Sequence, residues 1–176
     1  MKKYLIILLI VITILWVVLK DSDIRLSKNF TLSEFTKTSY PVNNEPSPEH
    51  IINLRRLVVN FLQPLRDYFN KPLIITSGYR SKELNSKLRN SSKNSQHLEG
   101  MAADFKITGE TNESVIKAIK DLGLSYDQLI DEQLYYENGK LISHIHVSYI
   151  NPYLNRNNTL IARNKKDNLN AVYFIA

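Results

Sequence analysis

Residues 95–104, with the sequence SQHLEGMAAD, decide how this chain is interpreted, because they place His97 and Asp104 close together. A second segment, SHIHVSY at residues 143–149, supplies two of the four histidines in the chain. Two imidazoles and a carboxylate can bind a zinc ion and leave a fourth position for water, which the metal acidifies into a nucleophile. The two segments together predict a hydrolytic zinc site.

The spacing within each segment suits such a site. Residues two apart share a face of a strand, so His144 and His146 should point the same way. Taken alone, this pair would more often be two surface histidines; beside residues 95–104, metal binding is the favoured interpretation. The small residues Gly100, Ala102 and Ala103 should let the backbone pass close to a bound ion, with the Asp104 carboxylate in the same cavity as His97.

The helices expected from sequence lie mostly in the first half. Ser47 followed by Pro48 marks a helix start, and apolar residues then recur at helical spacing. Pro64 should kink or break this helix near its end. Asn112 can cap a later helix that Gly123 closes.

The expected strands lie mostly in the second half. Asn138-Gly139 is a strong hairpin signal between two of them. Strands are predicted at residues 73–76, 102–107, from 128–130 onward, 141–149, 159–162 and 171–175. This order predicts an α+β fold: a single small domain with a mainly antiparallel sheet flanked by helices.

The N-terminus departs from the globular pattern. After Met1-Lys2-Lys3, residues 4–19 form an uninterrupted apolar run that ends at Lys20-Asp21. A helix of this length rises about 24 Å, somewhat less than the roughly 30 Å bilayer core. The run ends in the bulky residues 16–19, where a signal-peptide cleavage site would need small residues. We therefore expect a transmembrane signal anchor at 1–20, a linker at 21–29 and the domain at 30–176. A cleaved signal peptide is the main alternative. Positive-inside bias places the domain outside the cytoplasm, in the periplasm or cell wall.

Composition bounds the remaining possibilities. The chain has 176 residues, 43% hydrophobic and 23% charged, which suits one globular domain. The absence of cysteine excludes disulfides, cysteine-ligated zinc and thiol nucleophiles. A net charge of +6 suits anionic cell-wall polymers or lipid headgroups, and no motif supports nucleic-acid binding. We expect a monomer.

Several segments, in this order, resemble the zinc D-alanyl-D-alanine carboxypeptidase family, a group of the peptidase M15 type. They are SGYRS at 77–81, LN at 84–85, SQHLEGMAADF at 95–105, YDQLI at 126–130 and HIHVSY at 144–149. The likeness is strongest to the phage-endolysin-like and peptidoglycan-endopeptidase branch, and it covers residues 30–149. It implies a fold like that of hedgehog and DD-peptidase domains, and Zn²⁺ as the cofactor.

The resemblance also implies roles for particular residues. His97, Asp104 and His146 match the zinc ligands of the family. The substrate-binding residues that it implies are Arg80, Ser95 and Gln96. His144 matches a histidine that can hydrogen-bond the tetrahedral intermediate in some members of the family.

The general base departs from the family pattern. Much of the family has an acidic residue three positions before the last zinc ligand, but this chain has Ser143 there. The nearest carboxylates are Asp131 and Glu132. The pattern Gln-Leu-Ile-x-Glu at 128–132 resembles that of the same branch of the family, and this resemblance favours Glu132 as the catalytic base.

These observations predict a membrane-anchored or exported zinc metallopeptidase that cuts peptidoglycan stem peptides or cross-links. Its partners would be peptidoglycan peptides and, through the N-terminal run, a membrane. One alternative is a zinc-containing module that binds wall peptides without cutting them. Another is an envelope protein in which zinc only stabilises the fold.

Overall fold

The computed structural model describes residues 4, 7, 23–89, 91–137, 140–165 and 168–175. Within these ranges, no helix has the length and hydropathy needed to cross a membrane. Apart from Tyr4 and Ile7, the apolar run predicted as a signal anchor lies outside the described residues. The predicted turn Asn138-Gly139 also lies outside them, between two strands that pair with each other.

A six-stranded sheet in the order β1-β2-β4-β3-β5-β6 forms the centre of the fold. Its strands are β1 (Leu73–Ser77), β2 (Ala102–Ile107), β3 (Gln128–Glu137), β4 (Lys140–Ser148), β5 (Asn158–Lys165) and β6 (Asn168–Ile175). Neighbouring strands are antiparallel except β3 and β5, which are parallel. The predicted α+β class is confirmed, and the single parallel pairing makes the sheet mixed.

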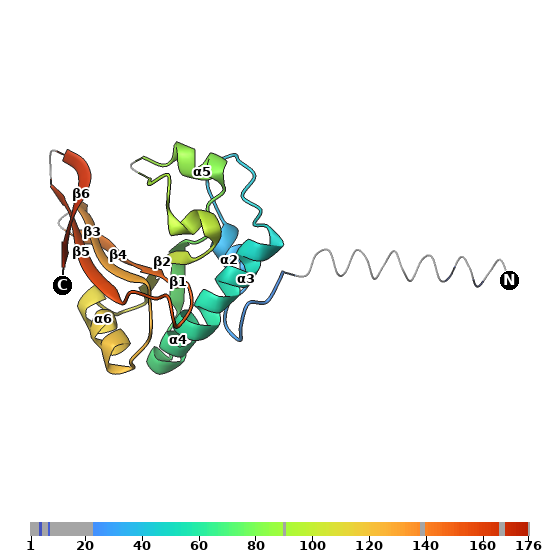
Figure 1. The fold of residues 1–176 in the computed structure, drawn as a ribbon, viewed down its shortest axis with the longest axis horizontal. Helices are drawn as coiled ribbons and strands as arrows, with labels where there is room; N and C mark the ends of the chain where they lie inside the picture. Colours follow the sequence, from blue (N-terminus) through green and yellow to red (C-terminus); the bar gives the residue numbers. More distant parts are fainter. Residues whose placement is uncertain are drawn as a thin grey trace.

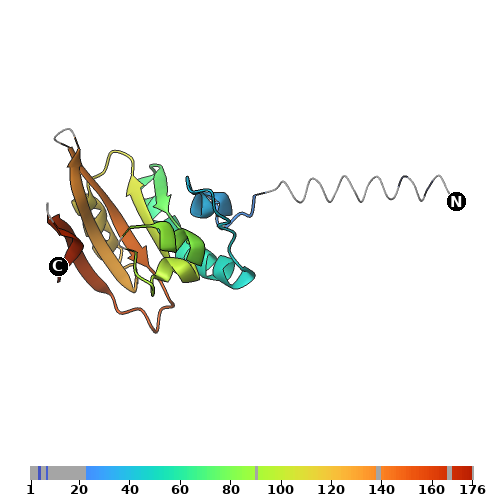
Figure 2. The ribbon, with the colours of Figure 1, turned by 90° about the horizontal axis from the view of Figure 1, so that it is seen from above.

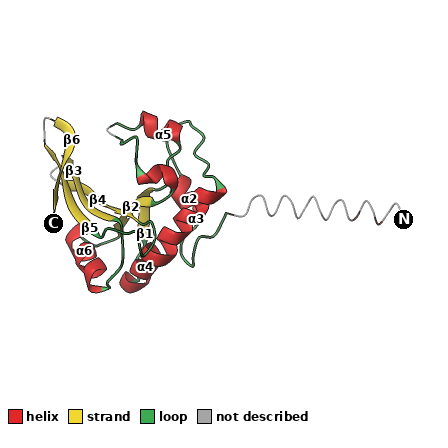
Figure 3. Cartoon of the chain, in the orientation of Figure 1, coloured by secondary structure: helices red, strands yellow, loops and turns green. Residues whose placement is uncertain are grey.

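Helices lie on both sides of this sheet. The helical segments are α2 (Leu32–Thr36), α3 (Pro48–Leu57), η1 (Val58–Leu62), α4 (Gln63–Phe69), α5 (Lys82–Lys87), η2 (Gln96–Glu99) and α6 (Asn112–Asp121). Figure 1 shows α4 and α6 below the sheet and α5 above it, and Figure 3 shows the same arrangement by element type. Viewed from above in Figure 2, the α5 and η2 segment (green) lies in front of the strands.

The helix predicted from Ser47 begins as expected but does not stop at Pro64. The Ser47 hydroxyl accepts a hydrogen bond from the His50 amide at 3.3 Å, which caps α3. The chain then passes through the π-helical turn η1 into α4 and stays helical to Phe69. Pro64 lies in the first turn of α4. Pro64 has no amide hydrogen to donate, and the wider π turn before it makes room for the proline ring. The prediction of a kink or break is therefore met only by this local departure from α-helical geometry, and the helix does not break.

The cap predicted for the later helix lies one residue earlier than expected. Thr111, not Asn112, is the N-cap of α6, and its hydroxyl accepts from the Ser114 amide at 3.1 Å. The Asn112 side chain instead donates to Asp131 Oδ1 at 2.6 Å and to the His144 carbonyl at 3.2 Å. This side chain therefore ties α6 to β3 and β4.

The two faces of the sheet have different characters. Along β4, Ile145 and Val147 are buried in the apolar core, as the alternating pattern predicted. Helices α3, α4 and α6 cover this face, with residues such as Leu54, Leu65 and Ile119. The opposite face carries the polar residues of the predicted site, so packing and chemistry are separated by the strand period.

The folded part extends into the stretch predicted as a linker. Leu26, within residues 21–29, is 3% exposed and belongs to the core. Arg25 forms an isolated β-bridge with Thr31 just before α2. Phe30 and Phe35 are buried in the same core, with ring centroids 6.1 Å apart. The segment before Phe30 joins the core because Leu26 has an apolar side chain that is buried there.

Candidate metal centre

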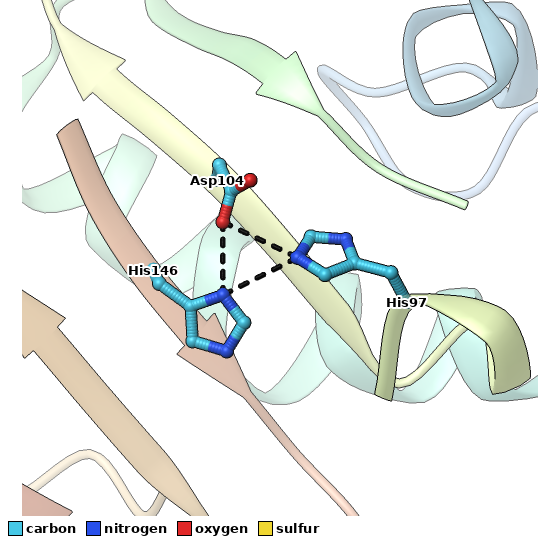
Figure 4. Close-up of side chains that lie close together, drawn as sticks. All are labelled: His97, Asp104 and His146. Carbon is cyan, nitrogen blue, oxygen red and sulfur yellow. Dashed lines mark hydrogen bonds and ion pairs between the residues drawn. The ribbon is translucent and has the colours of Figure 1, made fainter. Parts of the chain in front are cut away.

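Three elements bring the predicted zinc ligands together. Asp104 and His146 are direct partners in the β2–β4 register, and alternation puts both side chains on the face away from the core. His97 comes from the short helix η2, which ends at Gly100 in the left-handed conformation with φ of 67°. Figure 4 shows the three side chains pointing toward one another, and all three are buried.

The donor atoms form a triangle of the size that zinc requires. His146 Nδ1 lies 2.8 Å from Asp104 Oδ1, and His97 Nε2 lies 3.3 Å from each of these atoms. Ligand atoms around a tetrahedral zinc ion with bonds of about 2.0–2.1 Å are about 3.3 Å apart. Two imidazoles and one carboxylate also match the donor set of open zinc sites. The residues present therefore fit a zinc ion.

The hydrogen bonding of His97 fixes which nitrogen faces the centre. Its Nδ1 lies 2.6 Å from the carbonyl oxygen of Gly78, which can only accept a hydrogen bond. Nδ1 therefore donates, and Nε2 keeps its lone pair in the neutral ring. Burial lowers the pKa of His97, and the nearby Asp104 opposes this shift only in part. The neutral form, which binds metals, is favoured.

Asp104 is an ionised carboxylate with both oxygens engaged. Burial alone would raise its pKa, but the interactions with His97 and His146 outweigh burial and hold the pKa well below the usual range. Arg80 Nη2 lies 2.7 Å from Oδ2, so this carboxylate keeps a permanent counter-charge when the histidines are neutral. Oδ1 is the oxygen that faces the two imidazoles.

The predicted substrate-binding residues have partners within the protein. The Arg80 guanidinium donates to the Ser77 hydroxyl at 2.9 Å as well as to Asp104. These two contacts fix the orientation of the Arg80 side chain. The Gln96 side chain donates to the buried Asp127 at 2.9 Å. Ser95 is the half-buried N-cap of η2, and its side chain makes no capping hydrogen bond. Arg80 therefore contacts the predicted ligand Asp104, and Gln96, which precedes the predicted ligand His97, contacts Asp127.

Glu132 and His144 lie together beside the three donors. They are partners in the β3–β4 register, and Glu132 Oε2 lies 2.8 Å from His144 Nε2. The approach is not directed along the N–H bond, so Nε2 has no hydrogen bond of ordinary geometry within the described residues. Burial would lower the pKa of His144, but the close Glu132 carboxylate and the charge of Asp104 outweigh it, and the pKa is raised. His144 Nε2 also lies 3.9 Å from Asp104 Oδ2.

Gly100 has a different role from the one predicted. A Cβ at this position would lie 2.6 Å from the His50 carbonyl oxygen, which belongs to α3. The glycine is required by close packing of the η2 turn on α3 and by its positive φ. His50, the fourth histidine, lies on α3 with its Nε2 3.7 Å from Glu99 Oε2, outside the metal centre.

Sequence reasoning missed the pair formed by Asp127 and Arg156. Asp127 lies in the segment YDQLI, one of the motifs that resemble the family, but no role was predicted for Asp127 itself. Arg156 lies in an irregular loop after β4, and no spacing pattern links the two residues. The structure places their side chains 2.6 Å apart.

Residues 28–148 match the family model of peptidase M15, over more than half of the chain. The chain therefore belongs to the peptidase M15 family. A comparison with curated proteins finds no match. Membership makes the chain a peptidase, and the buried His-Asp-His group fits the zinc ion on which peptidases of this family generally depend.

Proposed function

We propose that this protein is a zinc metallopeptidase that hydrolyses peptide bonds in peptidoglycan stem peptides or cross-links. The observation that carries the proposal is the triangle of donor atoms from His97, Asp104 and His146, at 2.8 and 3.3 Å from one another. Zinc bound there would polarise the scissile carbonyl and acidify a water molecule. Membership of the peptidase M15 family makes the bond a peptide bond.

Glu132 is the proposed general base. Its carboxylate borders the centre through His144, and both side chains are mostly buried. A carboxylate in this place can take the proton of the attacking water and pass it to the leaving amine. Ser143 cannot do so: by strand alternation it shares the face of Ile145 and Val147, away from the donors. A carboxylate on the neighbouring strand therefore replaces the one missing from β4.

His144 and Arg80 complete the proposed machinery. Protonated His144, favoured by its raised pKa, would donate to the oxyanion that develops on the substrate. Arg80 holds Asp104 Oδ2 and so directs Oδ1 toward the two imidazoles. An outer contact of this kind on a ligating carboxylate orients the ligand and tunes its basicity.

Peptidoglycan as the substrate rests on sequence. The motifs from residue 77 to 149 resemble the peptidoglycan-cutting branch of the family, and a charge of +6 suits an anionic wall. The apolar run at 4–19 supports an anchored domain outside the cytoplasm. A module that only binds wall peptides is the alternative, favoured by Ser143 in place of the usual acidic residue.

Zinc content and cleavage by the purified full-length chain in detergent test the proposal. Zinc should bind near one equivalent, and peptidoglycan fragments should be cut; His146→Ala should abolish both. His50→Ala, which removes the histidine outside the centre, is the control and should keep both. Zinc without cleavage of any stem peptide would favour the binding module. A protein that binds no zinc would contradict the metal centre.

A further inference from the structure

Outside the metal centre, Asp127 is a second fully buried carboxylate, with 0% exposure just before β3. Arg156 holds it with two parallel bonds, Nε to Oδ1 at 2.7 Å and Nη2 to Oδ2 at 2.6 Å. The backbone amide of Arg156 also donates to Oδ1 at 3.2 Å. The hydrogen bond from Arg156 is the largest cause of the lowered pKa of Asp127. The carboxylate is therefore ionised and fixed in orientation.

The fourth donor to this carboxylate is Gln96, whose Nε2 lies 2.9 Å from Oδ2. A carboxylate offers about four acceptor positions, and these four donors fill them. Gln96 is the first residue of η2 and directly precedes the ligand His97. The contact thus joins the segment that carries a metal ligand to an ion pair on the far side of β4.

Backbone hydrogen bonds also hold the η2 segment. The Gln96 carbonyl accepts from the Met101 amide at 3.0 Å, and the His97 carbonyl accepts from the Arg80 amide at 3.1 Å. These bonds tie the segment to residues next to β1 and β2. The side chain of Gln96 reaches instead toward the residues that precede β3 and follow β4.

We propose that Asp127 and Arg156, acting through Gln96, position the η2 segment so that His97 is oriented for zinc before the ion binds. The inference rests on the proposed zinc site and deepens it, because it assigns part of the zinc affinity to a loop after β4. Arg156 lies beyond residues 28–148, the part of the chain that the family model covers. Asp127, Arg156 and Gln96 are positioning residues, since none of them is among the donors.

The loop that presents Arg156 is itself well anchored. The Asn155 side chain donates to the Ser125 hydroxyl at 2.9 Å, and the Asn157 amide donates to the Tyr126 carbonyl at 2.9 Å. Tyr126 in turn donates its amide to Asn157 Oδ1 at 3.1 Å. These contacts fix the loop in the place from which Arg156 reaches Asp127.

Zinc affinity of the full-length chain in detergent, measured by competition with a chromophoric chelator, tests the proposal. Gln96→Met keeps the length of the side chain, removes its donor and leaves Asp127 paired with Arg156. We expect zinc to bind about tenfold more weakly, the lower end of the effect of losing an outer partner of a metal ligand. The Tm of the metal-free variant should stay close to that of the unsubstituted chain.

Two further variants separate positioning from stability. Thr111→Ala removes the N-cap hydrogen bond of α6, which involves neither η2 nor the loop of Arg156. It should lower the Tm of the metal-free protein, because losing an N-cap costs about 1 kcal/mol, while leaving zinc affinity unchanged. Arg156→Lys keeps the charge but not the two parallel bonds, and should weaken zinc binding in the same direction as Gln96→Met.

Unchanged zinc affinity in both Gln96→Met and Arg156→Lys would overturn the positioning role while leaving the metal centre intact. An equal loss of affinity in Thr111→Ala would also overturn it, since the effect would then be one of general stability. If the unsubstituted chain bound no zinc, the proposed function itself would fall, and this inference with it.

Discussion

At the scale of single residues, the centre depends on which atoms already have partners. The Nδ1 of His97 is used by the Gly78 carbonyl, and the Oδ2 of Asp104 is used by Arg80. The atoms left over, Nε2 and Oδ1, are the ones that face His146. Hydrogen bonds on the outer sides of His97 and Asp104 therefore select their inner donor atoms before any ion is present.

Glu132→Gln separates catalysis from metal binding at this scale. The amide keeps the size of the side chain but cannot accept a proton, and Glu132 is not one of the three donors. We expect kcat to fall by about 100-fold or more, as for loss of a general base, with zinc content unchanged. Steady-state kinetics on a peptidoglycan peptide, with zinc analysis of the same sample, checks this. Unaltered kcat would remove Glu132 from the mechanism.

At the scale of elements, the turn from η2 into β2 sets the position of His97 relative to Asp104 on β2. Gly100 ends η2 with a φ of 67°, in close contact with the backbone of α3. The Asn53 side chain of α3 also donates to the Glu99 carbonyl at 2.9 Å. The ligand segment is thus packed between α3 on one side and the Asp127 ion pair on the other.

Gly100→Ala should destabilise the protein through this contact. The new Cβ would lie 2.6 Å from the His50 carbonyl oxygen, in addition to a left-handed backbone cost of about 1–2 kcal/mol. A total of about 2 kcal/mol lowers the Tm by about 4–8 °C in a protein of this size.

Gly123→Ala is the matched control, because Gly123 has a φ of 62° but nothing within 4 Å of the added Cβ. Thermal unfolding of the two variants isolates the contact with α3. Equal Tm values would show that packing at Gly100 contributes nothing beyond its φ.

At the scale of the whole molecule, the sheet separates a core from a metal centre. The apolar cluster runs from Leu26 through the helices to Tyr149 and fills the face that α3, α4 and α6 cover. The donors lie on the other face, joined by β2, β4 and η2. None of the three donors belongs to the apolar cluster, so zinc is expected to add stability to a domain that already folds.

Chelation of zinc should therefore inactivate the protein without unfolding it. A ligand present at about 1,000 times its Kd adds about 4 kcal/mol to the free energy of unfolding, which is lost when the metal is removed. We expect a lower Tm with EDTA, but an unchanged circular dichroism spectrum at 25 °C, and activity that returns with added zinc. Loss of the folded signal on chelation would favour a structural zinc site instead.

The amino-acid sequence by itself determined the α+β class, the strand alternation that puts His144 and His146 opposite the core, and the identity of the three donors. The class and the alternation follow from short-range periodicity. The choice of His97, Asp104 and His146 as ligands follows from the resemblance of their motifs to a zinc peptidase family, and these residue types are ones that zinc prefers. The sequence also indicated Glu132 near the centre, which the register of β3 and β4 accounts for, since Glu132 pairs with His144.

Only the tertiary structure decided the features that depend on contacts between distant segments. Examples are the Asp104 contact of Arg80, the contact of Gln96 with Asp127, and the packing of Gly100 on α3. A side chain's partner is set by which segments the fold brings within hydrogen-bond distance, and no local pattern encodes that. The helix through Pro64 shows the same limit, because the π turn makes room for the proline while the apolar residues on both sides of it pack in the core.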